Sequence, residues 1–145
     1  MKLLEQTIDE ITQYGEKKGK SAEEILRLLH TIQYAYYNHE YLPEDLHYPD
    51  PPVHDPKKIL KTVQANFPKH GKYAVIDIKD TGIGKGKKEI YNIHEDLSAL
   101  ILELLDISYY IKKTSKRYAL LCFKKSYEKK LQVLISRIVH YFVNM

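Results

Sequence analysis

The sequence predicts a single, mainly α-helical domain: a bundle of about five helices with one short extended segment in the middle. Apolar residues recur every three or four positions over most of the chain, which places them on one face of a helix. Five of the six prolines fall between residues 43 and 56, so the breaks in this pattern are concentrated in one place. With 145 residues, the chain is long enough to bury one hydrophobic core.

The first part of the chain predicts a pair of helices over residues 2–39. In the first helix, Leu4, Ile8 and Ile11 fall on one stripe. The second helix opens at Ser21, because a serine followed three residues later by glutamate has the spacing of a capping box. Its apolar positions continue to about residue 38.

The middle of the chain, residues 40–88, is predicted to be largely irregular, since its prolines exclude a long helix or a central strand. Asp55 followed by Pro56 suits the cap and first position of a short helix over about residues 56–66. The segment KYAVIDI, residues 72–78, alternates as a strand does. Because no partner strand is evident, an extended segment packed on the helices is an equal alternative.

The last part of the chain, residues 88–143, predicts two long helices. Apolar stripes run over about residues 88–111 and 116–143, and the polar segment KKTSK separates them. So short a connection predicts that the two helices pack as an antiparallel pair.

Charge is distributed unevenly along the chain, although the formal net charge is only +4. Residues 1–72 carry 10 basic and 11 acidic side chains, whereas residues 73–145 carry 13 and 8. A basic region and an acidic region in one small domain predict surfaces for charged partners. The predicted partner-binding residues are these: Lys112, Lys113, Lys116, Arg117 and Lys124 of the basic helices, with Glu44, Asp45 and Asp50 of the acidic loop.

Composition predicts a soluble cytoplasmic protein. The single cysteine excludes an internal disulfide bond and is typical of a reducing compartment. The first residues, MKLLEQTIDE, become acidic within five positions and lack the apolar core of a signal peptide. No apolar run approaches the roughly 20 residues that a membrane span needs.

The segment DTGIG, residues 80–84, resembles the first glycine box of the histidine-kinase and gyrase type of ATPase. The resemblance assigns Asp80 to adenine recognition and Gly82 and Gly84 to a loop that closes on the nucleotide, with Lys85 beside it. That family also needs a second glycine box, which the downstream sequence lacks. We therefore predict no cofactor and retain nucleotide or anion binding at residues 80–88 as an alternative.

No catalytic or metal-binding set emerges from the remaining residues. His39, His47 and His54 accompany several acids, but their spacing matches no compact metal-ligand pattern. His94, Glu95 and Asp96 stand at the start of a predicted helix, where the helix dipole favours acids. Cys122 lies between two apolar neighbours and is expected to pack as a small hydrophobe. The sequence therefore predicts a protein that is not an enzyme and binds no metal.

The segment HEDLSALILEL, from His94 to Leu104, resembles the D-D-L-A-D-I-Y-R-D-L segment of a bacterial domain-of-unknown-function family, number five-zero-six-three. The layout is similar too, with two N-terminal helices, a variable middle, a Y-x-V-x-D piece that begins here at Tyr73, and then the acidic helix. The last helix carries Phe123 and Tyr127 where that family tends to show tryptophan. The resemblance implies a helical fold in a bacterial protein and carries no known activity.

Our leading hypothesis is a non-enzymatic helical protein-protein interaction module of the bacterial cytoplasm, of the immunity or adaptor type. The thirteen tyrosines agree with it, because tyrosine is enriched at protein interfaces. The first alternative is nucleic-acid binding through the basic C-terminal helices, which would use the cations named above together with Lys125, Lys129 and Lys130. The second alternative is the anion site at residues 80–88.

Overall fold

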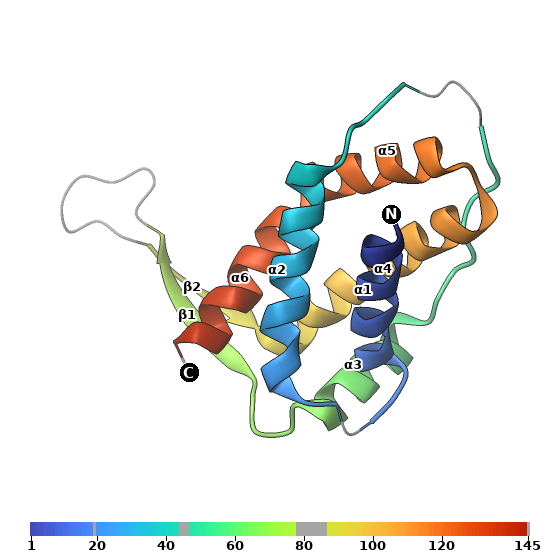
Figure 1. The fold of residues 1–145 in the computed structure, drawn as a ribbon. Coiled ribbons are helices and arrows are strands. Elements are labelled where there is room, and N and C mark those ends of the chain that lie inside the picture. The colour runs from blue at the N-terminus through green and yellow to red at the C-terminus, as the bar shows by residue number, and fades with distance from the viewer. Residues whose placement is uncertain (19, 44–46, 78–86, 145) are drawn as a thin grey trace.

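The computed structural model of the chain describes residues 1–18, 20–43, 47–77 and 87–144. The predicted mainly helical class is confirmed. The helices, shown in Figure 1, are α1 (Lys2–Thr12), α2 (Ala22–Asn38), α3 (Pro56–Asn66), α4 (Ile93–Lys113), α5 (Lys116–Ser126) and α6 (Gln132–Val143). A turn of 3₁₀ helix, Gln13–Gly15, extends α1, and a π-helical turn, Tyr127–Leu131, joins α5 to α6.

Several helices begin where the sequence provides a side-chain cap. Ser21 accepts a hydrogen bond from the Glu23 amide at the start of α2. Asp55 accepts one from the Lys57 amide at 3.0 Å, with a proline at the first position of α3. Each cap satisfies a backbone donor that a helix start otherwise leaves unpaired, which explains why these two boundaries are readable from the sequence.

The core is built around α4, which packs against α1, α3, α5 and α6. Leu97, Leu100, Ile101 and Leu104 on α4 are completely buried. The stripe predicted for α1 is buried as well, because Leu4, Ile8 and Ile11 all point into the same cluster. Burial of these apolar faces is the main stabilising contribution to a fold of this kind.

A two-stranded antiparallel hairpin stands at one side of the bundle and projects from it (Figure 1). It pairs β1 (Lys72–Asp77) with β2 (Lys87–Asn92), in a register that places Tyr73 opposite Tyr91. The extended segment predicted from Lys72 is therefore a β-strand, and β2 is its partner. The helix predicted from residue 88 begins instead at Ile93, because the Asn92 side chain caps it by accepting hydrogen bonds from the amides of His94 and Glu95.

The helix predicted over residues 116–143 is helical throughout but not one straight rod. The π-helical turn at Tyr127–Leu131 interrupts the regular pattern, and Figure 1 shows the chain changing direction between α5 and α6. As predicted, α5 packs back along α4, while α6 packs against α2 and α4. Insertion of a π turn is a known cause of a bend within a helix. Among the described helices, none has the length and apolar character needed to cross a membrane.

Candidate functional site

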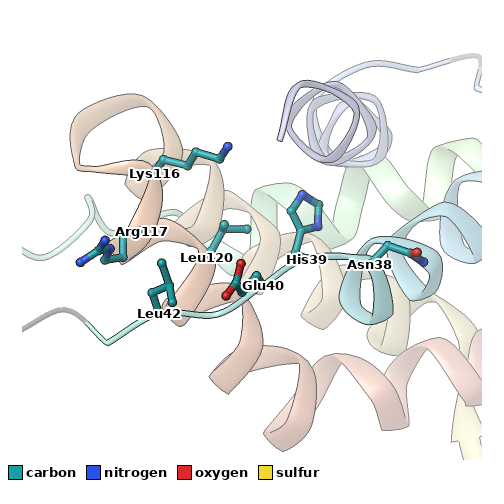
Figure 2. Close-up of a pocket in the computed structure, with 7 residues that line it drawn as sticks. All are labelled: Asn38, His39, Glu40, Leu42, Lys116, Arg117 and Leu120. Carbon is teal, nitrogen blue, oxygen red and sulfur yellow. The ribbon is translucent and has the colours of Figure 1, made fainter.

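A surface pocket lies between the end of α2, with the segment that follows it, and the first turns of α5 (Figure 2). It has a volume of about 360 Å³. The chain leaves α2 in an extended conformation at His39, so the segment that follows runs across the first turns of α5. The pocket is lined by Asn38, His39, Glu40, Leu42, Lys116, Arg117 and Leu120. We call it the α2–α5 pocket.

Two cations, Lys116 and Arg117, dominate the charge of the α2–α5 pocket. Both are exposed, and neither forms an ion pair with any residue that the structure describes. Figure 2 shows their side chains extending on different sides of Leu120. They occupy the first turn of α5, where the helix dipole disfavours positive charge.

The start of α3 differs from the start of α5 in the charge of its cap. Lys57 and Lys58 also lie in a first helical turn, but the carboxylate of Asp55 caps that helix and offsets them. The cap of α5 is Ser115, which is uncharged. The cap of α5 therefore does not offset the charge of Lys116 and Arg117 as Asp55 offsets that of the two lysines on α3.

Two tyrosines stand on the outer face of α2 just before the pocket. Tyr34 is 61% exposed and Tyr37 is 71% exposed. The backbone carbonyl of Tyr34 accepts a hydrogen bond from the amide side chain of Asn38, which lines the pocket. Tyr37 directly precedes Asn38 on α2, and Tyr34 lies about one helical turn before it. We call the two tyrosines together with the pocket the α2–α5 surface.

The predicted basic residues fall into two groups. Lys112 pairs with Asp9 at 3.1 Å, and Lys124 pairs with Glu128 at the same distance, so both are partly neutralised within the chain. Lys113 ends α4 and is exposed beside the turn into α5. The structure thus brings Lys116 and Arg117 to a pocket and gives Lys112 and Lys124 partners inside the fold.

The predicted acidic residues are only partly described. Glu44 and Asp45 lie outside the described residues, and Asp50 is exposed. Nearby in the same loop, Tyr48 contacts Tyr118 with a ring separation of 4.7 Å, so this part of the loop lies against α5. The candidate nucleotide residues Asp80, Gly82, Gly84 and Lys85 all lie outside the described residues.

A second polar cluster ties the hairpin to the helices. The Tyr73 hydroxyl donates a hydrogen bond to Asp96 at 2.8 Å, and Arg137 lies 3.5 Å from the other carboxylate oxygen. The Arg137 guanidinium also lies over the ring of Tyr91, 4.0 Å from its centre. Burial raises the pKa of Asp96, against the lowering effects of Tyr73 and Arg137. These groups bind one another, so we interpret the cluster as a structural connection between β1, β2, α4 and α6.

Cys122 is half-buried, and burial raises the pKa of its thiol above the ordinary value. A raised pKa leaves little thiolate at neutral pH, which is unfavourable for a nucleophile. Within the described part of the chain, no group of three or more His, Cys, Asp and Glu side chains is placed to hold a metal ion.

No family of known proteins, curated protein or solved structure matches the chain. The site is therefore defined by its own geometry. Of its lining residues, Lys116 and Arg117 are predicted by the sequence as partner-binding residues, and His39 belongs to a histidine set whose spacing matches no metal site. Asn38, Glu40 and Leu42 are not predicted, because only the path of the chain after α2 brings them next to the two cations.

Proposed function

We propose that this chain is a non-enzymatic protein-binding module of the adaptor or immunity type, and that its partner binds to the α2–α5 surface. The observation that carries the proposal is the position of two exposed tyrosines, Tyr34 and Tyr37, beside a pocket with two cations that lack ion pairs within the described chain. The bacterial cytoplasm is the expected setting, from the single cysteine and the family resemblance.

Tyrosine and arginine support a protein partner in particular. Alanine scanning of protein interfaces finds that tyrosine, tryptophan and arginine supply most of the residues whose truncation is costly. A tyrosine ring contributes a large apolar area with few rotatable bonds, so little conformational entropy is lost when a partner covers it. Tyr37 offers such a ring, since it is largely exposed and meets the ring of Tyr36 edge-on, with ring centres 4.9 Å apart.

Nucleic-acid binding through the basic C-terminal helices is the second candidate. Lys113, Lys116 and Arg117 gather at the turn between α4 and α5, which favours it. Four other cations of this half are already paired with acids, which lowers the charge available to phosphates: Lys112, Lys124, Lys130 and Arg137. Fluorescence anisotropy with a labelled DNA duplex and a labelled single strand distinguishes the two candidates. Binding at ~50 mM salt that falls steeply by ~200 mM would favour nucleic acid.

Affinity capture from a lysate of the source organism tests the leading proposal. The bait is the wild-type chain or the variant Tyr37→Ala/Lys116→Glu, and the control is Lys58→Glu. Lys58 is a matched control, because it is also an exposed lysine in the first turn of a helix but lies on α3, outside the α2–α5 surface. We expect a stoichiometric partner on the wild type and on the control, and its loss from the variant. The absence of any stoichiometric partner, or its full retention by the variant, would contradict the proposal.

A further inference from the structure

We propose that residues 48–54 form a left-handed polyproline II segment that binds an aromatic-lined groove with a cationic rim on a partner protein. This segment shares no residue with the α2–α5 surface, so it is a second binding surface and goes beyond the proposed function. Three features of the segment support it: the spacing of its prolines, the repeat of burial along it, and its anchoring at both ends.

The backbone of residues 48–54 is restricted to extended conformations. A proline ring fixes its own φ at about −65°, and the segment contains Pro49, Pro51 and Pro52. A residue that precedes a proline is also pushed out of the α region, towards the polyproline II region, and residues 48, 50 and 51 each precede one. Accordingly, residues 47–55 belong to neither a helix nor a strand, and Figure 1 shows the chain running outside the helices here.

Burial along the segment repeats at every third residue. Tyr48, Pro51 and His54 are half-buried. The four residues between them are exposed: Pro49, Asp50, Pro52 and Val53. A polyproline II helix has three residues per turn, so the half-buried residues lie along one ridge, and Pro49 and Pro52 lie along another.

The half-buried ridge faces the helices. The ring of Tyr48 contacts that of Tyr118 on α5, with centres 4.7 Å apart. Burial is the main cause of a raised pKa at Asp106 on α4, and His54 lies close enough to oppose it. Directly after the segment, Asp55 caps α3. The segment is therefore held at both ends, which reduces the conformational entropy that it loses when a partner binds.

The exposed residues determine what the segment can bind. Pro49 and Pro52 have the P-x-x-P spacing that docks in aromatic-lined grooves. Val53 is 99% exposed and adds apolar surface next to them. Asp50, which the sequence predicts as a partner-binding residue, is exposed and forms no ion pair with any residue that the structure describes. A cation at the rim of the partner's groove complements this carboxylate.

Tryptophan fluorescence tests this proposal directly, because the chain contains no tryptophan and emission excited selectively from tryptophan comes from the probe alone. The probes are three purified domains of the SH3, WW and EVH1 types, whose proline-binding grooves are lined by aromatic side chains that include tryptophan. Each probe is titrated with the full chain. We expect the emission of at least one of them to change as its groove is filled, and an excess of a peptide of residues 48–55 to reverse that change.

Variants show whether the exposed prolines are responsible. Pro49→Ala/Pro52→Ala removes both ring contacts and should weaken binding by at least ~tenfold. Pro43→Ala is the matched control, since Pro43 is an exposed proline of the same loop outside the segment, and it should bind as the wild type does. Thermal melts check that both variants fold. Binding by none of the three domains, or equal binding by the double variant and the wild type, would overturn the inference. Either result leaves the proposed function to be decided by the capture experiment, because the two surfaces have no residue in common.

Discussion

The side chain of Asn66, in the last turn of α3, donates a hydrogen bond to the backbone carbonyl of Tyr14 at 2.8 Å, across 52 residues of sequence. The same amide donates to the carbonyl of Lys17, and its oxygen accepts from the backbone amide of Lys20. One polar side chain thus fixes both ends of the connection between α1 and α2. This connection joins the two N-terminal helices, so its conformation determines the orientation of α2 relative to α1.

Replacing Asn66 with alanine should therefore destabilise the fold. Three backbone groups of the α1–α2 connection lose their partner, at a cost of about 1–3 kcal/mol in the free energy of unfolding. Chemical denaturation monitored by circular dichroism measures the change. Gln64→Ala, an exposed position on the same helix, is the control and should stay within about 0.5 kcal/mol of the wild type. An equal effect of both variants would mean that the Asn66 bonds contribute nothing specific.

Gly15 should not tolerate a side chain. A Cβ at this position would lie 2.9 Å from Cγ2 of Ile59 and 3.0 Å from Cγ2 of Ile101, both in the packed core. Gly15→Ala is expected to destabilise the chain by about 1–3 kcal/mol, as overpacking does. A Cβ on Gly71 would meet nothing within 4 Å, so Gly71→Ala is the matched control and should leave the melting temperature nearly unchanged. Unchanged stability of the Gly15 variant would show that the core yields at this point.

Asp96 should make stability depend on pH in a defined direction. Burial raises its pKa in the folded chain, so the folded state binds more protons than the unfolded state between the ordinary carboxyl pKa and the raised value. The stability of the wild type relative to Asp96→Asn should therefore be greatest at acidic pH. It should fall as pH rises from about 4 through the raised pKa, and then level off. Thermal melts of both proteins across pH measure this difference in stability. A wild-type advantage that grows with pH would contradict a raised pKa of Asp96 in the folded chain.

Tyr37 and Tyr36 are adjacent on α2 but should respond oppositely to substitution. Tyr37 is exposed on the α2–α5 surface, so Tyr37→Ala should leave the melting temperature unchanged and weaken partner binding by at least ~fivefold. Tyr36 stacks on Tyr127 of the π-helical turn with ring centres 4.1 Å apart, so Tyr36→Ala should lower the melting temperature. Calorimetry for stability and titration with the captured partner for affinity separate the two effects. A Tyr37 variant that binds normally would remove this residue from the interface.

Cys122 should react slowly with thiol reagents in the folded chain. Burial raises the pKa of its thiol, so the reactive thiolate is scarce at neutral pH. The absorbance change with Ellman's reagent should be slow in buffer and complete within the dead time of mixing in strong denaturant. Labelling of the folded protein at the rate of a free cysteine would show that the site is more open than its burial indicates.

Elements whose signals are local could be predicted from the sequence alone. The stripe through Leu4, Ile8 and Ile11 and the cap at Asp55 each depend on residues within one or two helical turns, so they were readable without the fold. The same local reasoning led to the wrong start for α4. Ile90 stands three positions before Ile93, which continues a helical spacing, yet Ile90 is 66% exposed and belongs to a strand. Pairing with β1, beyond the glycine-rich segment, decided that conformation.

The candidate site, by contrast, depends on how distant parts of the chain meet in the fold. Lys116 and Arg117 are visible in the sequence as two of many cations, and their neighbours in the chain do not show that they form no ion pair with the described residues. The path of the chain after α2 brings Asn38, Glu40 and Leu42 to them across more than seventy residues, while Lys112 forms an ion pair with Asp9 on α1. Hydrogen bonds within a helix connect residues four apart, and this is why the helices could be predicted. The pairing of charges and the shape of a pocket depend on which helices meet, and that is set by the burial of the whole core.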